Sequence, residues 1–451
     1  SNLRGLLLPV LSLLCVFSVA VSAAELQRRT YLGLQFDLQD KSAPGLAVTA
    51  VMPGSTAAAA GIRPGDRLTS VGEVNLIKAF DDLRQELGRT TAGQRIFMRY
   101  YRGPNNAIRV SPPLSVLPRE EVPGSLVRYE QVSVDGIRQR LILTEPIEGS
   151  RALVFFLQGL GCSSVDYWLD VENPVKRLID VWAAAGYATA RLEKRGAGDS
   201  DGPECSDLSF EDERRGYQAA LEALAGRGFD ERIFLFGHGF GGVLAPLVTS
   251  RAVAGVMVYG TVAEPWFDYA MMNFERQDRL AGYSEEEIAR RQTLREAFQT
   301  GLLVEGLTPA ELRERIDGVE NLEDDQLATD DHYDGRSVAF FVALGAHDPG
   351  RAWRQVWQPT LAIHGSYDWK STRQDHERIA RLTGGKFQTL PGLDHDFMRY
   401  ESEQQSFVSQ GTGRFAGTLV DATVAWMTTV PLPEPPESPS DAMSGNGEGG
   451  G

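Results

Sequence analysis

Two ionisable residues in the last quarter of the sequence have the types and positions that catalysis uses. Asp368 comes just after an apolar run of strand length, Thr360 to His364, and His395 follows the next such run. Residues that follow parallel strands gather at one edge of a sheet, so we expect this carboxylate and this imidazole to lie close together. An imidazole oriented by a carboxylate can remove a proton from a nucleophile and later return it to a leaving group.

The segment expected to carry the nucleophile is RIFLFGHGFGG, Arg232 to Gly242, which reads as an apolar strand, a glycine-rich turn and a helix. It resembles the nucleophile elbow G-x-S-x-G of α/β-hydrolases, but the central residue is Gly239 instead of serine. A phosphate-binding loop would need a Lys-Ser/Thr ending, and a dinucleotide fingerprint would need other glycine intervals. The chain order Gly239, Asp368, His395 is the order in which α/β-hydrolases place nucleophile, acid and histidine.

The same resemblance implies an oxyanion hole. In α/β-hydrolases one donor is the amide that follows the nucleophile, here Phe240, and the other comes from a loop after an earlier strand. The run FFLQGLGC, Phe155 to Cys162, is similar to that loop, and the amide of Leu160 is the expected second donor. The alternative is that Gly159 and Gly161 only make a turn.

Further segments extend the resemblance over Val127 to Thr428. RLEKRGAGDSDGPEC and YGTVAEPWFDYA resemble loops that line the pocket in exported, PDZ-containing hydrolases related to the prolyl-oligopeptidase and acyl-peptidase branch. The resemblance implies that the strands before Cys162 and Cys205 are neighbours, so a disulfide is expected there if the chain is exported; the alternative is two buried free thiols. Aromatic residues expected at the pocket edge are Trp266, Phe267 and Tyr269.

The elements that must position these residues alternate between apolar runs and amphipathic helical stretches. This pattern predicts an α/β domain over residues 125–430, with a mostly parallel sheet covered on both faces. The strands cease between Glu264 and Arg336, where charged helices predict a lid, over about residues 264–340. The expected central strands are Leu153 to Leu157, Ala188 to Leu192, Ile233 to Phe236, Gly255 to Tyr259 and Thr360 to His364.

Residues 30–117 predict a separate, small α+β unit of short strands, with helices at Ser55 to Ala60 and Phe80 to Leu87. Its run VTAVMPGSTAAAAGIRPGDRLTSVGEVNL resembles the PDZ domains attached to exported proteases. The resemblance implies that Leu32, Gly33 and Leu34 form a loop of backbone N–H groups for a peptide C-terminus. The alternative is that Gly33 and Gly65 only make turns and that no working peptide groove exists. The expected strands are Leu46 to Val51, Arg67 to Val71, Arg95 to Tyr101 and Ala107 to Val110.

The two ends of the chain predict export and disorder. Residues 1–23 combine Arg4, the apolar run Leu6 to Ala20 and small residues up to Ala23, which is typical of a cleaved signal peptide and shorter than a comfortable membrane span. A periplasmic or secreted protein is therefore expected. The Pro-, Ser- and Gly-rich tail at residues 431–451 has little to bury and is predicted to be disordered.

The composition of the chain limits which classes of binding partner are expected. The 451 residues carry a formal charge of −16, which argues against nucleic-acid binding and leaves peptides, proteins or small molecules. The remaining histidines lack metal-ligand spacing, so neither a metal nor an organic cofactor is expected; they are His238, His332, His347, His364 and His376.

Gly239 divides the functional interpretations into two classes. One is a hydrolase of ester, thioester or amide bonds whose serine has been replaced, or which activates water through His395 and Asp368. The other is a non-catalytic binding protein that combines the PDZ-like unit with a ligand-holding pocket. Substrate identity is not legible in the sequence, because lid and pocket walls carry no transferable motif.

Overall fold

The computed structural model describes residues 26–433, except 41, 78–82, 84–85, 88–89 and 323–328. The predicted signal peptide, most of the helix expected at Phe80 to Leu87 and nearly all of the C-terminal tail therefore lie outside the described residues. Within the described ranges, no helix has the length and apolar character that crossing a bilayer requires.

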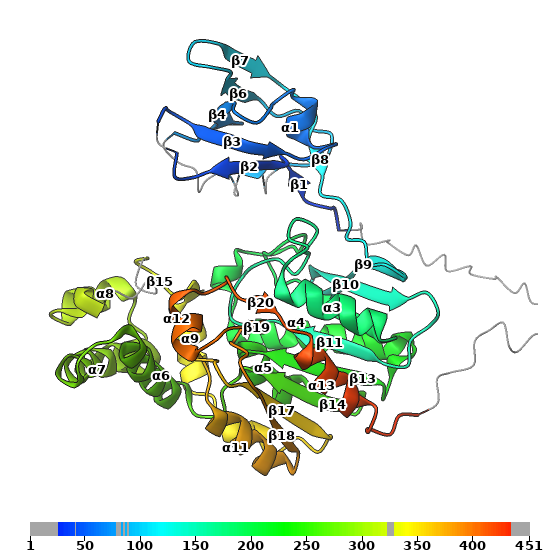
Figure 1. Ribbon diagram of the computed structural model, residues 1–451, viewed down its shortest axis with the longest axis vertical. Helices are drawn as coiled ribbons and strands as arrows, with labels where there is room; N and C mark the ends of the chain where they lie inside the picture. The colour runs from blue at the N-terminus through cyan, green and yellow to red at the C-terminus, as the bar shows by residue number, and fades with distance from the viewer. Residues whose placement is uncertain are drawn as a thin grey trace, which may run out of the picture.

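The described part of the N-terminal module contains an antiparallel sheet and the short helix α1, drawn in blue and cyan in Figure 1. The strand expected from Arg95 begins only at Met98, because Arg95 forms a single isolated bridge with Pro113, which has no N–H to continue a ladder. Helix α1 (Thr56–Ala59) starts as expected, with the Ser55 hydroxyl accepting from the Ala58 N–H at 3.1 Å. The sheet order is β2 (Leu34–Asp37), β3 (Leu46–Val51), β4 (Arg67–Val71), β6 (Met98–Tyr101) and β7 (Ala107–Val110), with β5 (Val74–Asn75) beside β4.

The larger domain is built on one eight-stranded sheet. Its order is β18 (Lys386–Leu390), β17 (Thr360–Gly365), β14 (Val253–Tyr259), β13 (Ile233–His238), β11 (Leu153–Leu157), β12 (Ala188–Leu192), β10 (Ile137–Pro146) and β9 (Ser125–Val134). The first six strands are parallel, and β10 and β9 add an antiparallel edge. The predicted mostly parallel α/β sheet is thereby confirmed.

Helices cover both faces of this sheet (Figure 1). In β11, Phe155 and Leu157 face one core with α4 (Phe210–Leu224), α5 (Phe240–Val248) and α11 (Arg373–Thr383). Val154 and Phe156 face the other core with α3 (Pro174–Ala184) and α13 (Thr418–Met427). Burial on both sides explains why the central strands are continuous apolar runs without alternation.

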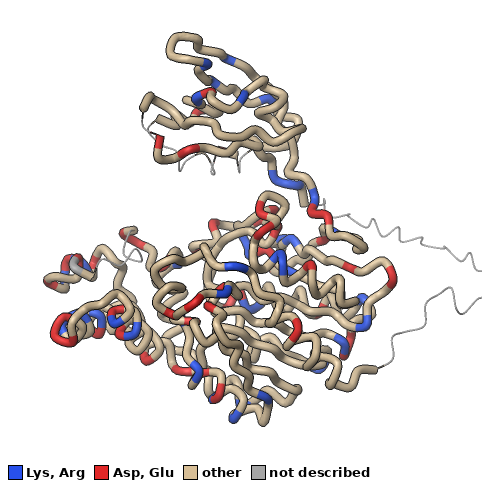
Figure 2. The backbone as a smooth tube through the Cα atoms, viewed as in Figure 1, with Lys and Arg blue, Asp and Glu red and all other residues tan. Residues whose placement is uncertain are grey.

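The lid lies between β14 and β17. It contains α6 (Trp266–Ala281), α7 (Glu285–Thr300) and α8 (Pro309–Arg315), then α9 (Val338–Gly345) and α10 (Pro349–Trp353) lead back to the sheet. The expectation that strands are absent up to Arg336 is wrong in detail, because β15 (His332–Tyr333) and β16 (Arg336–Ser337) form a short hairpin. A two-residue ladder is too short to produce a strand pattern in sequence. Figure 2 shows acidic and basic residues interspersed along the lid helices.

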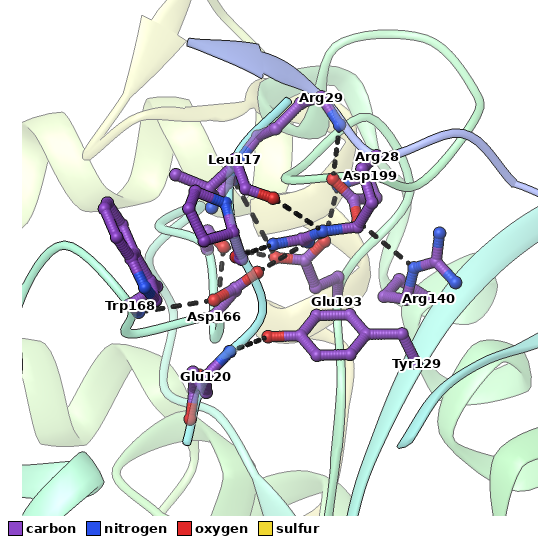
Figure 3. A network of polar contacts seen from close by, with 12 residues as sticks. Arg28, Arg29, Leu117, Glu120, Tyr129, Arg140, Asp166, Trp168, Glu193 and Asp199 are labelled. Atoms are coloured by element: carbon purple, nitrogen blue, oxygen red, sulfur yellow. Dashed lines mark hydrogen bonds and ion pairs between the residues drawn. The ribbon is translucent and has the colours of Figure 1, made fainter. Parts of the chain in front are cut away.

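The segment that precedes the N-terminal module is fastened to the larger domain by Arg28. Its guanidinium donates to the carbonyl oxygens of Leu117, at 3.2 Å, and Pro118, at 2.5 Å. It also binds two buried carboxylates, Asp166 at 2.7 Å and Asp199 at 2.6 Å (Figure 3). Strands β1 (Thr30–Tyr31) and β8 (Ser115–Val116), which lie next to Arg28 and Leu117 in sequence, pair with each other, so Arg28 joins both linkers of the module to the larger domain.

Replacing Arg28 by methionine should lower the free energy of unfolding by about 3–5 kcal/mol, because Asp166 and Asp199 would stay buried after losing a charge partner. Arg373→Met is the matched control: Arg373 pairs with Glu377 in water, and its loss should cost under about 1 kcal/mol. Urea unfolding of the two variants measures the difference. Equal losses would show that Arg28 is not a structural anchor.

Candidate active site

The turn from β13 into α5 places Gly239 at the carboxyl edge of the sheet. Gly239 has φ 53° and ψ −121°, a backbone conformation that is strained for any residue with a side chain. Backbone strain of this kind is found at functional turns. The turn is tight because α5 starts at once: a Cβ on Gly241 would lie 2.0 Å from the carbonyl oxygen of Leu157 in the neighbouring strand. The geometry is that of a strained strand-to-helix turn that pushes one side chain out of the sheet.

His395 faces this turn. A Cβ built on Gly239 would lie 3.2 Å from His395 Nε2, within reach of a hydrogen bond from a hydroxyl attached to it. His395 Nδ1 lies 3.1 and 3.2 Å from the two carboxylate oxygens of Asp368. The structure thus brings together the three positions predicted in the order Gly239, Asp368, His395.

Asp368 is fully buried and fully hydrogen-bonded. It accepts from the backbone N–H of Lys370 at 2.8 Å, and from the N–H and hydroxyl of Ser371 at 3.1 and 2.6 Å. Burial alone would raise the pKa of Asp368, but the charge of His395 and hydrogen bonds from His395 and Ser371 outweigh burial and hold the pKa well below its usual range. Burial lowers the pKa of His395, yet the Asp368 charge prevails and raises the pKa above 6.5. The pair is arranged to stabilise an imidazolium.

The lid reaches this pair through Arg276 of α6. Its guanidinium donates to the carbonyl oxygens of Ser371, at 2.7 Å, and Asp368, at 2.8 Å, and it also pairs with Glu403. No sequence motif marks Arg276. Its contacts join residues nearly a hundred positions apart, so only the folded chain reveals that the lid supports the loop carrying the acid.

His238 has a larger role than the sequence indicated. It is buried and its Nε2 donates to the carbonyl oxygen of His395 at 2.9 Å, which fixes the backbone of the catalytic candidate. Burial, together with the positive charge of His395, lowers the pKa of His238 to about 4, so it stays neutral. Its position next to Gly239 was the only sequence signal for this role.

A possible metal group also involves His238. Among the described residues, ligand atoms of His238, His395 and Asp396 lie within 4.8 Å of one another. Ligands around a tetrahedral zinc with bonds of 2.0–2.1 Å would be about 3.3 Å apart. Because this group is wider and His238 Nε2 is engaged by a carbonyl, we assign no metal to it.

The two expected oxyanion donors line the same cavity of about 370 Å³ as Gly239 and His395. Phe240 is the first residue of α5, where the N–H has no partner within the helix. The N–H of Leu160 likewise donates no hydrogen bond to any of the described residues. Trp266, Phe267 and Tyr269 all pack against the core, and of the three Trp266 and Tyr269 also line this cavity.

Lys194 and Arg336 hold the Leu160 loop from behind. Lys194 Nζ donates to the carbonyl oxygens of Gly159, at 2.6 Å, and Gly161, at 2.9 Å. Arg336, the first residue of β16, donates to the carbonyl oxygen of Leu160 at 2.8 Å. Both cations pair with the buried carboxylate of Glu213, at 2.8 and 2.6 Å. In a trans peptide the N–H points opposite to the carbonyl of the same unit, so a Gly159 carbonyl that accepts from Lys194 directs the Leu160 N–H away from Lys194.

A disulfide closes the same loop. Cys162 and Cys205 are bonded, with their Cα atoms 5.8 Å apart, and they follow β11 and β12, which are parallel neighbours. The loop carrying Leu160 is therefore fixed by the disulfide at one end and by hydrogen bonds from Lys194 and Arg336 to its carbonyl oxygens. Lys194 lay in the quoted segment RLEKRGAG, but its role could not be predicted, because its carbonyl partners are about 35 residues away.

Comparison with known proteins identifies both parts of the chain. A family model described as serine aminopeptidase, S33 matches residues 149–403, more than half of the chain, and a PDZ domain model matches residues 47–102. Among curated proteins, Esterase EstD of Thermotoga maritima is 22% identical over 306 residues, which cover 66% of this chain and 67% of the esterase.

Solved structures with similar coordinates include Est1E from Butyrivibrio proteoclasticus, which is 15% identical with a TM-score of 0.42 and covers 67% of this chain and 98% of its own. The α/β-hydrolase GrgF from Penicillium sp. sh18 is 14% identical with a TM-score of 0.43 and covers 70% of this chain and 99% of its own.

Lys194→Met should loosen the Leu160 loop without unfolding the domain, because the carbonyls of Gly159 and Gly161 would lose their donor at a cost of about 1–3 kcal/mol each. Hydrogen exchange should accelerate at residues 158–163 and stay unchanged in α3. Lys176→Met is the control, because among the described residues Lys176 pairs with Asp180 of the same helix α3 and with no other carboxylate. Faster exchange throughout both regions would indicate a global loss of stability instead of a positioning role.

Proposed function

Because the chain belongs to the serine aminopeptidase S33 family, we propose that it is an exported protein of the serine-hydrolase type, directed at ester, thioester or amide bonds. Its nucleophile position is Gly239, so the chain as written is inactive or weakly active. The observation that carries the proposal is the 3.2 Å between a Cβ on Gly239 and His395 Nε2. The esterase name of the Thermotoga maritima relative supports ester bonds within this range.

A serine at position 239 would complete a known sequence of steps. His395 takes the hydroxyl proton as the oxygen attacks the carbonyl carbon, and Asp368 steadies the imidazolium. The oxyanion accepts from the N–H groups of Leu160 and Phe240, the imidazolium then protonates the leaving group, and water releases the acyl group by the reverse steps. With glycine, only activation of water by His395 remains, which is a far weaker route.

The second candidate function is a non-catalytic binding protein. It is favoured by the absence of a side chain at Gly239 in a site whose cavity, oxyanion donors and His395–Asp368 pair are otherwise complete. In that case the PDZ module recruits a chain terminus and the cavity of about 370 Å³ holds a ligand. The two functions differ in what a restored serine would do.

Export is part of the proposal, with periplasmic or secreted location. It rests on the signal-like residues 1–23, which lie outside the described residues, and is supported by the Cys162–Cys205 disulfide, which persists in oxidising compartments. The working domain boundaries are residues 30–117 and 125–430.

Gly239→Ser should produce a protein that a fluorophosphonate probe labels covalently, because the base and the acid are already in place. Adding His395→Ala should abolish labelling.

The labelling rate of the serine variant should rise with pH through the His395 pKa, which lies above 6.5, since only neutral imidazole accepts a proton. It should fall near pH 8, where burial places the pKa of Lys194 and its loss of charge releases the Leu160 loop. A folded serine variant that stays unlabelled would favour the binding protein.

The PDZ module should bind peptides with a free C-terminal carboxylate. Gly33 lies so close to α1 that a Cβ on Gly33 would be 2.2 Å from Ser55 Cβ. The N–H groups of Leu32 and Gly33 have no hydrogen-bond acceptor among the described residues, so they can bind a carboxylate. In the full-length protein, Gly33→Val should abolish the binding of peptides from a C-terminal library, and C-terminal amidation of the peptides should do the same. Equal binding of free and amidated peptides would exclude a carboxylate loop.

A further inference from the structure

A cavity of about 840 Å³ lies over strands β4 and β6 of the PDZ module, whose positions Figure 1 shows. Arg67 of β4 and Arg99 and Tyr101 of β6 line it. Leu68 and Tyr100, which alternate with these residues along the two strands, are buried in the core of the module. The cavity therefore lies on the face of the sheet that is turned away from the core.

This cavity is separate from the peptide groove expected in a PDZ domain. Neither the loop at residues 32–34 nor strand β2 contributes a residue to it. In addition, β4 and β6 are internal strands with a hydrogen-bonded strand on each side, in the order β3, β4, β6, β7. An extended peptide has no free backbone edge to pair with at this place, so recognition here depends on side chains.

One wall of the cavity is held in position by Arg67. Its guanidinium pairs with the Asp40 carboxylate at 2.6 Å and donates to the carbonyl oxygen of Gly45 at 2.8 Å. These contacts fix the loop between β2 and β3, from which Ala43 and Pro44 line the cavity. Because Asp40 already neutralises Arg67, this arginine supports the wall and leaves ligand binding to other residues.

Arg99 is a half-buried cation with no carboxylate partner among the described residues. Its Nη2 donates to the Tyr101 hydroxyl at 2.6 Å, and its Nε is buried without a partner. Its Nη1 has no partner among the described residues either, but it is not one of the buried atoms, so a ligand can reach it. Arg109 of β7, the direct cross-strand neighbour of Arg99, adds a second positive charge on the same face.

The other polar groups of the cavity are mainly donors. The Tyr101 oxygen accepts from Arg99, so its own proton remains available to a ligand. Asn75 uses its Oδ1 to accept from the Ile77 N–H at 3.1 Å, which leaves its side-chain NH₂ as a donor. Glu73 also lines the cavity, but it is exposed and water screens its charge. Ile77, which is 51% exposed, supplies an apolar surface beside these donors.

We propose that this cavity binds a small organic carboxylate with an apolar body. The carboxylate accepts from Arg99 Nη1 and from the Tyr101 hydroxyl, which are charge-assisted hydrogen bonds, and the apolar body packs on Ile77 and Pro44. Sites for small molecules usually measure about 300–1,000 Å³, a range that includes this cavity. The proposal does not depend on the hydrolase function.

Equilibrium dialysis of the full-length protein tests the proposal. The probes are octanoate, 4-phenylbutyrate and indole-3-acetate, each compared with its uncharged amide. We expect at least one acid to be retained about tenfold more than its amide, because only the acid neutralises Arg99. Arg99→Gln should lower the retention of that acid about tenfold and Tyr101→Phe about threefold. Since Tyr101→Phe removes a single oxygen, it keeps the test decisive if Arg99→Gln lowers the folded fraction.

Two control variants locate the binding. Arg63→Gln removes an exposed arginine of the same module that does not line the cavity, and it should leave retention unchanged. Gly33→Val blocks the expected peptide loop and should also leave retention unchanged. Equal effects of Arg63→Gln and Arg99→Gln, loss of retention in Gly33→Val, equal retention of acids and amides, or no retention of any of the three acids would each overturn the proposal.

Discussion

The rest of the site depends on the distance between helix α5 and strand β11. The helix must begin immediately after β13 and pass within contact of the neighbouring strand, and only glycine at position 241 leaves room for the Leu157 carbonyl. This approach forces the strained backbone at Gly239 and leaves the N–H of Phe240 free at the start of the helix. His395 and Asp368 enter from the next parallel strands, which end at the same edge, so their meeting at residue 239 follows from strand order.

Two groups of buried charges connect the site to its surroundings, and they share the loop after β12. Lys194, at the start of that loop, donates to the carbonyl oxygens of Gly159 and Gly161, and Asp199, in the middle of it, pairs with Arg28 of the N-terminal segment. Glu193, which directly precedes Lys194, accepts from the Ser164 hydroxyl and from the Asp199 N–H, and burial raises its pKa to about 7. The linkers of the PDZ domain and the loop that carries Leu160 are thus both anchored to the short segment 193–199.

With glycine at position 239, the site has the geometry of a hydrolase site but no nucleophilic side chain. The strained turn, the oxyanion loop and the oriented His395 are all present, although nothing is there to be acylated. Glycine also relieves the strain that serine would carry at φ 53°, so the fold does not need the missing side chain. The cavity of about 370 Å³ at this site is therefore formed without a side chain at position 239.

Local patterns in the sequence were sufficient for the central strands, the turn at Gly239 and the residues Asp368 and His395, because each depends on neighbours within a few positions. The bounds of Leu153–Leu157 and Ala188–Leu192 agree with the structure for this reason. Only the tertiary structure decided which side chains support the site. Arg336 holds a carbonyl 176 residues away, and His238 holds one 157 residues away. Such contacts join charged or polar groups that look like ordinary surface residues in sequence, and their burial is set by how the lid, the sheet and the linkers pack together.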